Sequence, residues 1–308
     1  MTATLSAWFN GELITSSLAS TSVASSADFL LDRSNTFGDG VFETMLVTGG
    51  QVHLLDRHLH RLAIGLERLG IVCSTEIVQA DINKALSHLS INSASNPSTH
   101  ILKFVISRGS SVFGYGSNDL SINRLVLLKP HLLRGSSTSS SHKPSNKPLS
   151  EASGLQLMVC DTRLGLQPAL AGIKHCNRLE QVLAKKEVER EGFDDGLMLD
   201  QAGNIIESTS ANIFILEAGQ LVTPPIIDCG VAGVMREYVI DQLDITVSEA
   251  TISLERLYKS DGVILTNSVR GLMIANACRM ADGSLHHWPK SDTLMALQQV
   301  VNRSMDSQ

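Results

Sequence analysis

The segment that most constrains the fold is a run of serine, proline and lysine near the middle of the chain, RGSSTSSSHKPSNKPLSEAS at residues 134–153. It offers too little apolar surface to offset the conformational entropy lost on ordering it. We therefore interpret residues 133–153 as an interdomain linker between a smaller domain over residues 1–132 and a larger one over residues 154–308. A long surface loop within one domain is the alternative.

Composition and charge exclude several classes of protein. With 43% hydrophobic and 18% charged residues the chain is typical of a globular protein. A net charge of -6 does not favour binding to nucleic acid, although an acidic chain can still hold a basic pocket for an anionic ligand. There is no run of 18 apolar residues and no basic start followed by an apolar core, so we expect neither membrane insertion nor secretion.

Cysteine and histidine usage argues against disulfides and metals. The five cysteines are odd in number, widely spread and never in a CxxC pair, which favours a reducing cytoplasm. His53, His58 and His60 are close in sequence, but on a helix residues 58 and 60 point apart. We therefore expect no metal site.

The N-terminal half alternates strand and helix patterns. Asn10-Gly11 between apolar flanks predicts a hairpin, and VFETMLV with QVHLL predicts a second strand pair. Leucines at positions 55, 59, 62, 66 and 69 form one stripe of a helix over residues 54–69. A second helix is expected over 75–89, followed by strands at 101–107 and 124–128.

The C-terminal half continues this mixture without regularity. Helices are expected over 177–191, 233–243, 253–258 and 291–303, and strands over 155–160, 196–200, 212–216, 245–250, 262–267 and 271–277. The order lacks the βαβα repeat of a doubly wound sheet, and no GxGxxG motif occurs. An α+β fold of two α/β domains is the remaining class.

One lysine has a sequence context suited to chemistry. Lys174 follows the apolar residues Leu170, Ala171 and Ile173 and comes just before an amphipathic helix. Desolvation favours the neutral amine, which can form a Schiff base with a carbonyl or an aldehyde cofactor. The alternative is a lysine that extends from a core-facing turn to solvent.

Ordered motifs along nearly the whole chain carry a family resemblance. FGDGVFET, LLDRHLHRL, KFVISRGS, LAGIKHCNRLEQVL, DDGLMLDQAGNIIESTSANIF, GVMR and LTNSV follow one another at plausible spacing. Together they resemble the class IV pyridoxal-phosphate enzymes, most closely the 4-amino-4-deoxychorismate lyases. The resemblance implies fold type IV, in which a small α/β domain and a larger domain with a barrel-like sheet hold pyridoxal 5'-phosphate between them, and it implies a homodimer.

The same resemblance implies an activity in folate biosynthesis, the β-elimination that converts aminodeoxychorismate to 4-aminobenzoate and pyruvate. Two alternatives stay open. The first is a class IV aminotransferase that acts on D- or branched-chain amino acids with the same lysine. The second is a non-catalytic binding protein that keeps the fold, although a lysine, a glutamate and an arginine retained together argue against it.

Each demand of the cofactor has a candidate in the sequence. Lys174 is the expected anchor for the aldehyde and the base, and Glu207 is the expected partner of the ring nitrogen, as the resemblance implies. Arg61 is a candidate for the phosphate, with Gly65 one turn on leaving room for a ligand. Further phosphate donors are expected at a helix start and at a strand end, namely the backbone of Val234 and Met235, and Asn267 with Ser268.

Substrate contacts are expected from the N-terminal half. Phe42 and Thr44 share one face of a strand. The resemblance implies that this strand lines the substrate side of the pocket, where Thr44 can assist proton transfer, and Arg108 and Tyr115 are candidates for substrate carboxylates. The chain departs from many relatives at Phe113, where they carry an arginine. This weakens the aminotransferase interpretation most. The carboxylate pair Asp194 and Asp195 is expected to form a solvated turn.

Overall fold

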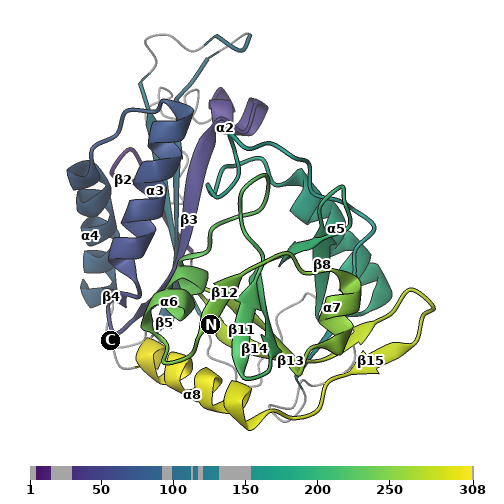
Figure 1. Ribbon diagram of the computed structural model, residues 1–308. Helices are drawn as coiled ribbons and strands as arrows, with labels where there is room; N and C mark the ends of the chain where they lie inside the picture. Colours follow the sequence, from purple (N-terminus) through teal and green to yellow (C-terminus); the bar gives the residue numbers. More distant parts are fainter. Residues whose placement is uncertain are drawn as a thin grey trace. The chain divides into compact units, whose positions relative to one another are not determined.

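The computed structural model describes residues 5–14, 30–91, 99–111, 114–116, 121–131 and 154–306 (Figure 1). The predicted linker over 133–153 and Phe113 both lie outside the described residues. The chain divides into two compact units. The N-terminal unit comprises Met1–Ser136, Ile173–Asn177 and Gln308, and the C-terminal unit comprises Ser137–Gly172 and Arg178–Ser307. The sequence did not predict that residues 173–177 group with the N-terminal unit.

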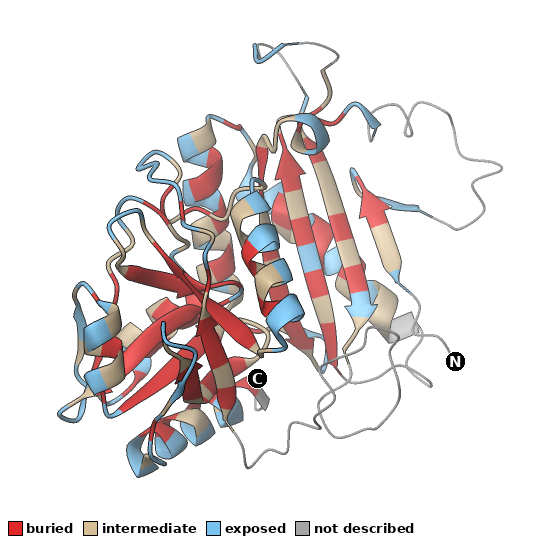
Figure 2. Cartoon of the chain, turned by 90° about the vertical axis from the view of Figure 1, so that its right-hand side faces the viewer, coloured by how far each residue is buried: buried red, intermediate tan, exposed pale blue. Residues whose placement is uncertain are grey.

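The N-terminal unit is built on one antiparallel sheet with the strand order β2-β1-β6-β5-β3-β4. Its strands are β1 (Ser6–Phe9), β2 (Glu12–Ile14), β3 (Gly40–Thr48), β4 (Gln51–Val52), β5 (Thr99–Ser107) and β6 (Asn123–Pro130). Asn10 and Gly11 both have positive φ, 49° and 83°, which confirms the predicted hairpin. Burial alternates along β3, β5 and β6, as the banding in Figure 2 shows, so the sheet has one buried and one less buried face.

Helices cover the buried face of this sheet. They are α3 (Leu55–Leu69) and α4 (Thr75–Ile91), while the short helix α2 (Arg33–Thr36) comes before β3 in the chain. Leu62 and Leu66 of α3 and Val78 and Ile82 of α4 pack with Met45 and other strand residues in one hydrophobic core. The predicted leucine stripe is therefore confirmed, with Leu55, Leu59 and Leu69 partly buried at its margins.

Gly65 has a different role from the one expected. A Cβ atom at this position would lie 3.0 Å from Val41 Cγ1 and 3.7 Å from Ile173 Cβ. The missing side chain therefore lets α3 approach β3 and the lysine segment closely. The space that a side chain of residue 65 would occupy is already filled by atoms of Val41 and Ile173. The expectation that Gly65 leaves room for a ligand was wrong.

The C-terminal unit is built on nine strands, six of which close into a ring. The strands are β7 (Leu155–Val159), β8 (Asp195–Leu199), β9 (Ile205–Ser208), β10 (Asn212–Glu217), β11 (Gln220–Thr223), β12 (Val247–Glu249), β13 (Gly262–Asn267), β14 (Gly271–Arg279) and β15 (Leu285–His287). The order β10-β13-β14-β7-β8-β9 returns to β10 through a β9–β10 pairing. This confirms the predicted barrel-like sheet and the mixed α/β class.

Four helices surround this ring, α5 (Leu179–Glu191), α6 (Val234–Gln242), α7 (Leu254–Lys259) and α8 (Asp292–Asp306). Leu157, Leu199, Ile213 and Leu265 are among the buried residues that fill the core. Strands β8, β9 and β10 are buried along nearly their whole length, which explains why they read as apolar runs (Figure 2). Within the described ranges, no helix is long and apolar enough to cross a membrane.

Candidate active site

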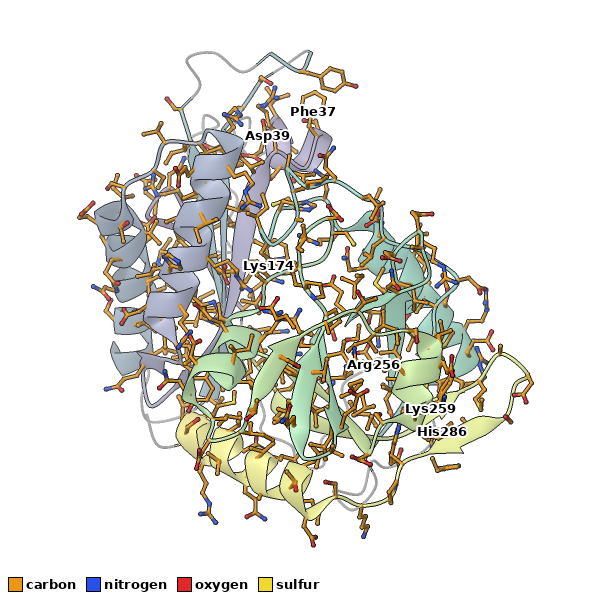
Figure 3. The ribbon with its side chains drawn as sticks, in the orientation of Figure 1. Phe37, Asp39, Lys174, Arg256, Lys259 and His286 are labelled. Atoms are coloured by element: carbon orange, nitrogen blue, oxygen red, sulfur yellow. The ribbon has the colours of Figure 1, made fainter. Side chains whose placement is uncertain are left out.

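Lys174 is held by main-chain pairing to β3. The Phe42 N–H donates to the Lys174 carbonyl at 2.9 Å, the Cys176 N–H donates to the Gly40 carbonyl at 2.8 Å, and Val41 forms an antiparallel bridge with His175. Strand β4 pairs only with the far end of β3, at Val47 and Thr48. The lysine segment therefore extends the sheet along the free edge at the start of β3, next to which Lys174 lies in Figure 3.

This pairing decides where the Lys174 amine lies. Lys174 is opposite Phe42, so the two side chains share a face, and the Lys174 Nζ is 4.5 Å from the centroid of the Phe42 ring. Thr44 is two residues further along β3 and shares that face, whereas Val41, Glu43 and Met45 are buried on the other. The structure thus brings together Lys174, Phe42 and Thr44, three of the residues predicted to act on substrate.

Arg61 is engaged by a buried carboxylate that the sequence interpretation overlooked. Its Nε donates to Glu43 Oε1 at 2.8 Å and its Nη2 donates to Oε2 at 2.5 Å, while His58 Nδ1 lies 2.6 Å from Oε2. Glu43 is 1% exposed and His58 is fully buried. These contacts form a cluster of Glu43, His58 and Arg61 between α3 and β3.

The charges of this cluster follow from its contacts. Burial alone would raise the pKa of Glu43, but the Arg61 charge and hydrogen bonds from His58 and Arg61 outweigh it and lower the pKa to about 2. Burial lowers the pKa of His58 and outweighs the hydrogen bond and the charge of Glu43, which raise it, with smaller lowering contributions from the charges of Arg61 and Lys174. Glu43 is therefore ionised and His58 neutral at pH 7, so the His58 Nδ1–H donates to the carboxylate.

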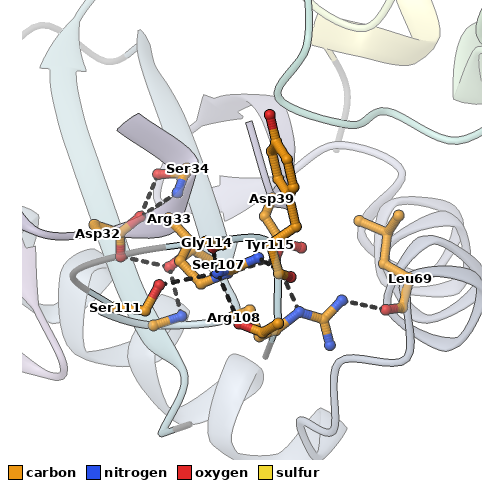
Figure 4. A network of polar contacts seen from close by, with 12 residues as sticks. Asp32, Arg33, Ser34, Asp39, Leu69, Ser107, Arg108, Ser111, Gly114 and Tyr115 are labelled. Atoms are coloured by element: carbon orange, nitrogen blue, oxygen red, sulfur yellow. Dashed lines mark hydrogen bonds and ion pairs between the residues drawn. The ribbon is translucent and has the colours of Figure 1, made fainter. Parts of the chain in front are cut away.

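Arg108 is also bound within its own unit (Figure 4). Its Nε donates to Asp39 Oδ2 at 2.9 Å, its Nη1 donates to the Gly70 carbonyl at 2.9 Å, and its Nη2 donates to the Leu69 carbonyl. These bonds fix the end of β5 to the C-terminus of α3. The geometry thus gives Arg108 a structural role at this junction, beside the carboxylate-binding role predicted from sequence.

Arg33 is the residue that fixes the segment around Tyr115. Its guanidinium donates to Asp39 at 2.8 Å, to Ser111 Oγ at 2.9 Å and to the Tyr115 carbonyl at 3.0 Å (Figure 4). Burial would raise the pKa of Asp39, but hydrogen bonds from Arg108 and Arg33 lower it. The Tyr115 ring is 85% exposed and contacts the Phe37 ring, so its backbone is anchored while its phenol is accessible. No motif in the sequence indicated Arg33.

In the C-terminal unit, Glu207 is a buried carboxylate held by neutral donors. It is 5% exposed, and it accepts hydrogen bonds from the Val231 N–H at 2.8 Å and from Gln181 Nε2 at 3.1 Å. Gly230, at φ 85°, passes so close that a Cβ there would lie 3.3 Å from Glu207 Oε2. The loop before α6 is therefore built around this carboxylate.

Asn212 joins Glu207 to the start of α6 and the end of β13. It pairs with Glu207 across β9 and β10 and with Thr266 across β10 and β13, and its Nδ2 donates to the Val231 carbonyl at 2.8 Å. A Cβ on Gly233, the N-cap of α6, would collide with Asn212 Oδ1. All the cofactor-binding residues predicted in this unit thus lie around Asn212. They are Glu207, Val234, Met235, Asn267 and Ser268.

The predicted phosphate donors differ in how their groups are used. Gly233, the N-cap of helix α6, has no side chain that could accept hydrogen bonds from the first N–H groups of the helix. The first two residues of the helix, Val234 and Met235, are each 2% exposed. Asn267 instead uses its side chain locally, because its Oδ1 accepts from the N–H groups of Val269 and Arg270 at 3.1 and 2.8 Å. The geometry favours the helix start as the phosphate-binding part.

Asp195 does not form the solvated turn that was expected. It is 1% exposed within β8 and accepts hydrogen bonds from the hydroxyls of Ser208, Thr209 and Ser210 at 3.1, 2.5 and 3.1 Å. A buried carboxylate requires such donors, and the run of three hydroxyl residues after Glu207 was a sequence signal that the prediction did not use. Asp195 therefore fixes the turn between β9, which carries Glu207, and β10.

The donor set fits pyridoxal phosphate. The N-terminal unit carries a half-buried lysine amine over an aromatic ring, and the C-terminal unit carries a buried carboxylate close to an uncapped helix start. These groups match an aldehyde, a ring nitrogen and a phosphate respectively. Among the described residues, no group of three or more His, Cys, Asp or Glu side chains is arranged to hold a metal ion.

Comparison with known proteins establishes the family. The amino-transferase class IV family model matches residues 40–278, and the chain belongs to this family of enzymes, which act on small molecules and use pyridoxal phosphate. The cofactor expected from the sequence is thereby confirmed.

Individual relatives include both branches of the family. An aminodeoxychorismate lyase from Vibrio harveyi is 34% identical over 78% of this chain and 83% of its own length. A putative branched-chain-amino-acid aminotransferase from Methanocaldococcus jannaschii is 28% identical over 85% of this chain and 83% of its own. The crystal structure of 4-amino-4-deoxychorismate lyase from Pseudomonas aeruginosa superposes with a TM-score of 0.78 and 31% identity, covering 97% of this chain and 99% of that one.

Proposed function

We propose that the chain is a 4-amino-4-deoxychorismate lyase, which converts aminodeoxychorismate to 4-aminobenzoate and pyruvate. The lyases among its relatives support this, at 34% and 31% identity over most of both chains. The observation that carries the proposal is the pairing of Lys174 with β3, which sets its amine over Phe42 on the face that holds Thr44. An amine and a hydroxyl on one face of a sheet suit proton removal at one atom and proton return at another.

The residues have the following roles in this proposal. When bound, pyridoxal phosphate supplies an aldehyde for the substrate amine and a protonated ring that accepts electron density. Lys174 anchors the cofactor and then removes the proton from the substrate ring carbon that bears nitrogen. The carbon–oxygen bond to the enolpyruvyl group breaks as the ring becomes aromatic, and Lys174, helped by Thr44, returns a proton to form pyruvate.

The remaining residues bind and orient. Glu207 keeps the cofactor ring nitrogen protonated, because an ionised carboxylate favours the charged form of its partner. The N–H groups of Val234 and Met235 bind the phosphate at the start of α6, with Arg61 as a further donor that keeps its Nε and Nη2 bonds to Glu43. Phe42 and Tyr115 border the substrate. Asn267 and Ser268 complete the phosphate side through the turn that Asn267 stabilises.

We further propose a homodimer in the cytoplasm. All five cysteines are free, as a reducing compartment favours. Sedimentation of the purified protein tests the dimer, and a mass of 33.2 kDa for the particle in solution would contradict it.

The decisive experiment supplies aminodeoxychorismate to the purified, cofactor-loaded protein without any keto acid. We expect 4-aminobenzoate and pyruvate in equal amounts. Lys174→Ala should abolish turnover, whereas Lys186→Ala, a change at an exposed lysine of α5, should leave it unchanged. Borohydride reduction followed by peptide mass spectrometry should place the cofactor on Lys174. An adduct on another lysine, or an active Lys174→Ala protein, would refute the assignment.

The second candidate is an aminotransferase of the same family, which the Methanocaldococcus jannaschii relative favours. The same preparation distinguishes the two. Transfer of the amino group from a D- or branched-chain amino acid to 2-oxoglutarate, with no release of 4-aminobenzoate from aminodeoxychorismate, would establish the aminotransferase and end the lyase proposal.

A further inference from the structure

We propose that Lys103 binds the ring carboxylate of the substrate. This inference rests on the proposed function, because it concerns a substrate with a carboxylate para to its reacting amine. Lys103 is the first residue of the motif KFVISRGS, but the sequence analysis assigned it no role. Lys103 lies on β5 opposite Thr44, and its side chain therefore shares the face of the sheet that carries Lys174.

The register of the sheet places Lys103 beside the catalytic residues. Lys103 pairs with Thr44 across β3 and β5. Its Nζ lies 4.9 Å from the centroid of the Phe42 ring, the same ring that Lys174 Nζ approaches to 4.5 Å. Two ammonium groups thus contact one aromatic ring, and Thr44 is the residue paired with Lys103 on the same face of the sheet.

The ammonium group of Lys103 has no acidic partner in the described part of the chain. Its direct neighbours across the sheet are Thr44 on β3 and Leu127 on β6, which are both neutral. Lys103 forms no ion pair with a described Asp or Glu, and it is the exposed residue in the middle of β5. A cation held in this way is available to an anionic ligand.

The arginines near this face are already committed. Arg61 binds Glu43, and both Arg33 and Arg108 bind Asp39. Since each guanidinium is paired with a carboxylate of its own unit, recruiting one to the substrate would break a largely buried ion pair. Lys103 can bind a carboxylate without that cost.

The spacing of the two lysines suits the substrate. In aminodeoxychorismate the amine and the ring carboxylate lie at opposite ends of one six-membered ring. Lys174 must meet the end that bears nitrogen, and Lys103 reaches the same Phe42 ring from β5. A substrate ring lying along Phe42 would have its amine at Lys174 and its carboxylate at Lys103. Lys103 would then select for a carboxylate and set the distance from the reacting carbon to Lys174.

Three variants test this proposal. Lys103→Met removes the charge and keeps the length of the side chain, and Lys103→Arg keeps the charge. Lys129→Met is the matched control, since Lys129 is exposed two residues beyond Leu127 on the same side of β6. We expect Lys103→Met to raise KM roughly 10- to 100-fold, as for loss of a hydrogen bond to a charged group. Lys103→Arg should recover most of this, and Lys129→Met should change KM less than twofold.

A binding measurement separates recognition of the carboxylate from catalysis. Calorimetry on the loaded protein compares 4-aminobenzoate with its neutral isostere 4-aminobenzamide. The unmodified protein should prefer the carboxylate by roughly tenfold or more, and Lys103→Met should lose that preference while keeping its affinity for the amide. The visible absorbance of the bound cofactor should be the same in all variants.

The outcomes distinguish this inference from the proposed function. If the unmodified protein releases 4-aminobenzoate and Lys103→Met keeps both its KM and its preference for the carboxylate, the role of Lys103 is refuted and the lyase stands. If the unmodified protein transfers amino groups and releases no 4-aminobenzoate, the lyase proposal fails. If the same protein also binds 4-aminobenzoate no better than 4-aminobenzamide, the proposed role of Lys103 is refuted as well.

Discussion

Replacing Glu43 with glutamine tests whether the buried cluster of Glu43, His58 and Arg61 stabilises the N-terminal unit. Glutamine keeps the size of the side chain and mimics the protonated acid, so the variant isolates the charge. Glu43 is 1% exposed and lies between two donors, so the interaction is screened little by solvent. Arg61 would retain its charge without the carboxylate that now pairs with it.

The magnitude follows from the lowered pKa. The pKa of Glu43 is about 2 in the folded protein and 4.5 for a glutamate exposed to solvent, as in the unfolded chain, and each pKa unit corresponds to about 1.4 kcal/mol. Because the folded pKa is the lower one, this stability is present above pH 4.5 and is lost as the pH falls toward 2. At pH 7 the contribution is on the order of 3 kcal/mol, of which about 2 kcal/mol is lost by pH 3.

Fluorescence of Trp8 provides the assay. The chain has two tryptophans, and Trp8 belongs to the same core as Val41 and Met45, the neighbours of Glu43 on its face of β3. In a Trp288→Phe background, urea unfolding followed through Trp8 reports on the N-terminal unit. Glu43→Gln should lower the free energy of unfolding by roughly 3 kcal/mol at pH 7 and by about 1 kcal/mol at pH 3.

The matched control is Glu67→Gln, the same change at an exposed position of α3. It should alter the free energy of unfolding by less than about 0.5 kcal/mol at either pH. Equal stabilities of Glu43→Gln and the parent at pH 7, or a difference that does not shrink on acidification, would show that the cluster does not stabilise the fold through the charge of Glu43.

Further predictions concern other buried groups. Asp195→Asn should lower the free energy of unfolding by roughly 2 kcal/mol or more and weaken cofactor binding measured by absorbance, because the turn after Glu207 loses the charge and one of the two acceptor oxygens of Asp195. Gly65→Ala should destabilise the N-terminal unit by about 1 kcal/mol in the Trp8 assay, since its Cβ would press on Val41 at 3.0 Å. Arg33→Lys should increase proteolysis near Tyr115, because a lysine cannot replace the forked donor. Burial raises the pKa of three thiols to about 12, so maleimide at pH 8 should leave them unmodified in the native protein by mass spectrometry; they are Cys160, Cys229 and Cys278.

Local patterns predicted the elements well because each depends on neighbours in sequence. The helix expected over 54–69 is observed at Leu55–Leu69, and the one expected over 233–243 is observed at Val234–Gln242. The closure of the C-terminal ring required pairings between distant segments, such as Leu155 with Ala275, for which period and turn signals carry no information. The pairing of residues 174–176 with β3 is of the same kind.

For the candidate site too, local sequence patterns placed some residues correctly, whereas contacts between distant residues were not predicted. Alternation alone correctly sent Phe42 and Thr44 to one face, and the motif located Lys174 beside them. The partners of Arg61 and Arg108 were not foreseen, because an arginine in a sequence shows its donors and not the carboxylate that will occupy them. Both were assigned to ligands, and both bind acids of their own unit in the structure.

One signal for this was present in the sequence. If Phe42 and Thr44 share the less buried face of β3, Glu43 must point into the core, where an ionised carboxylate requires a cation. The helix that packs on that face offers Arg61, so alternation and the cost of a buried charge together predict the pair. The same rule applied to β5 sends Phe104 inward and Lys103 to the face of Thr44. The same reasoning therefore adds Lys103, which has no acidic partner among the described residues, as a candidate for binding substrate carboxylates.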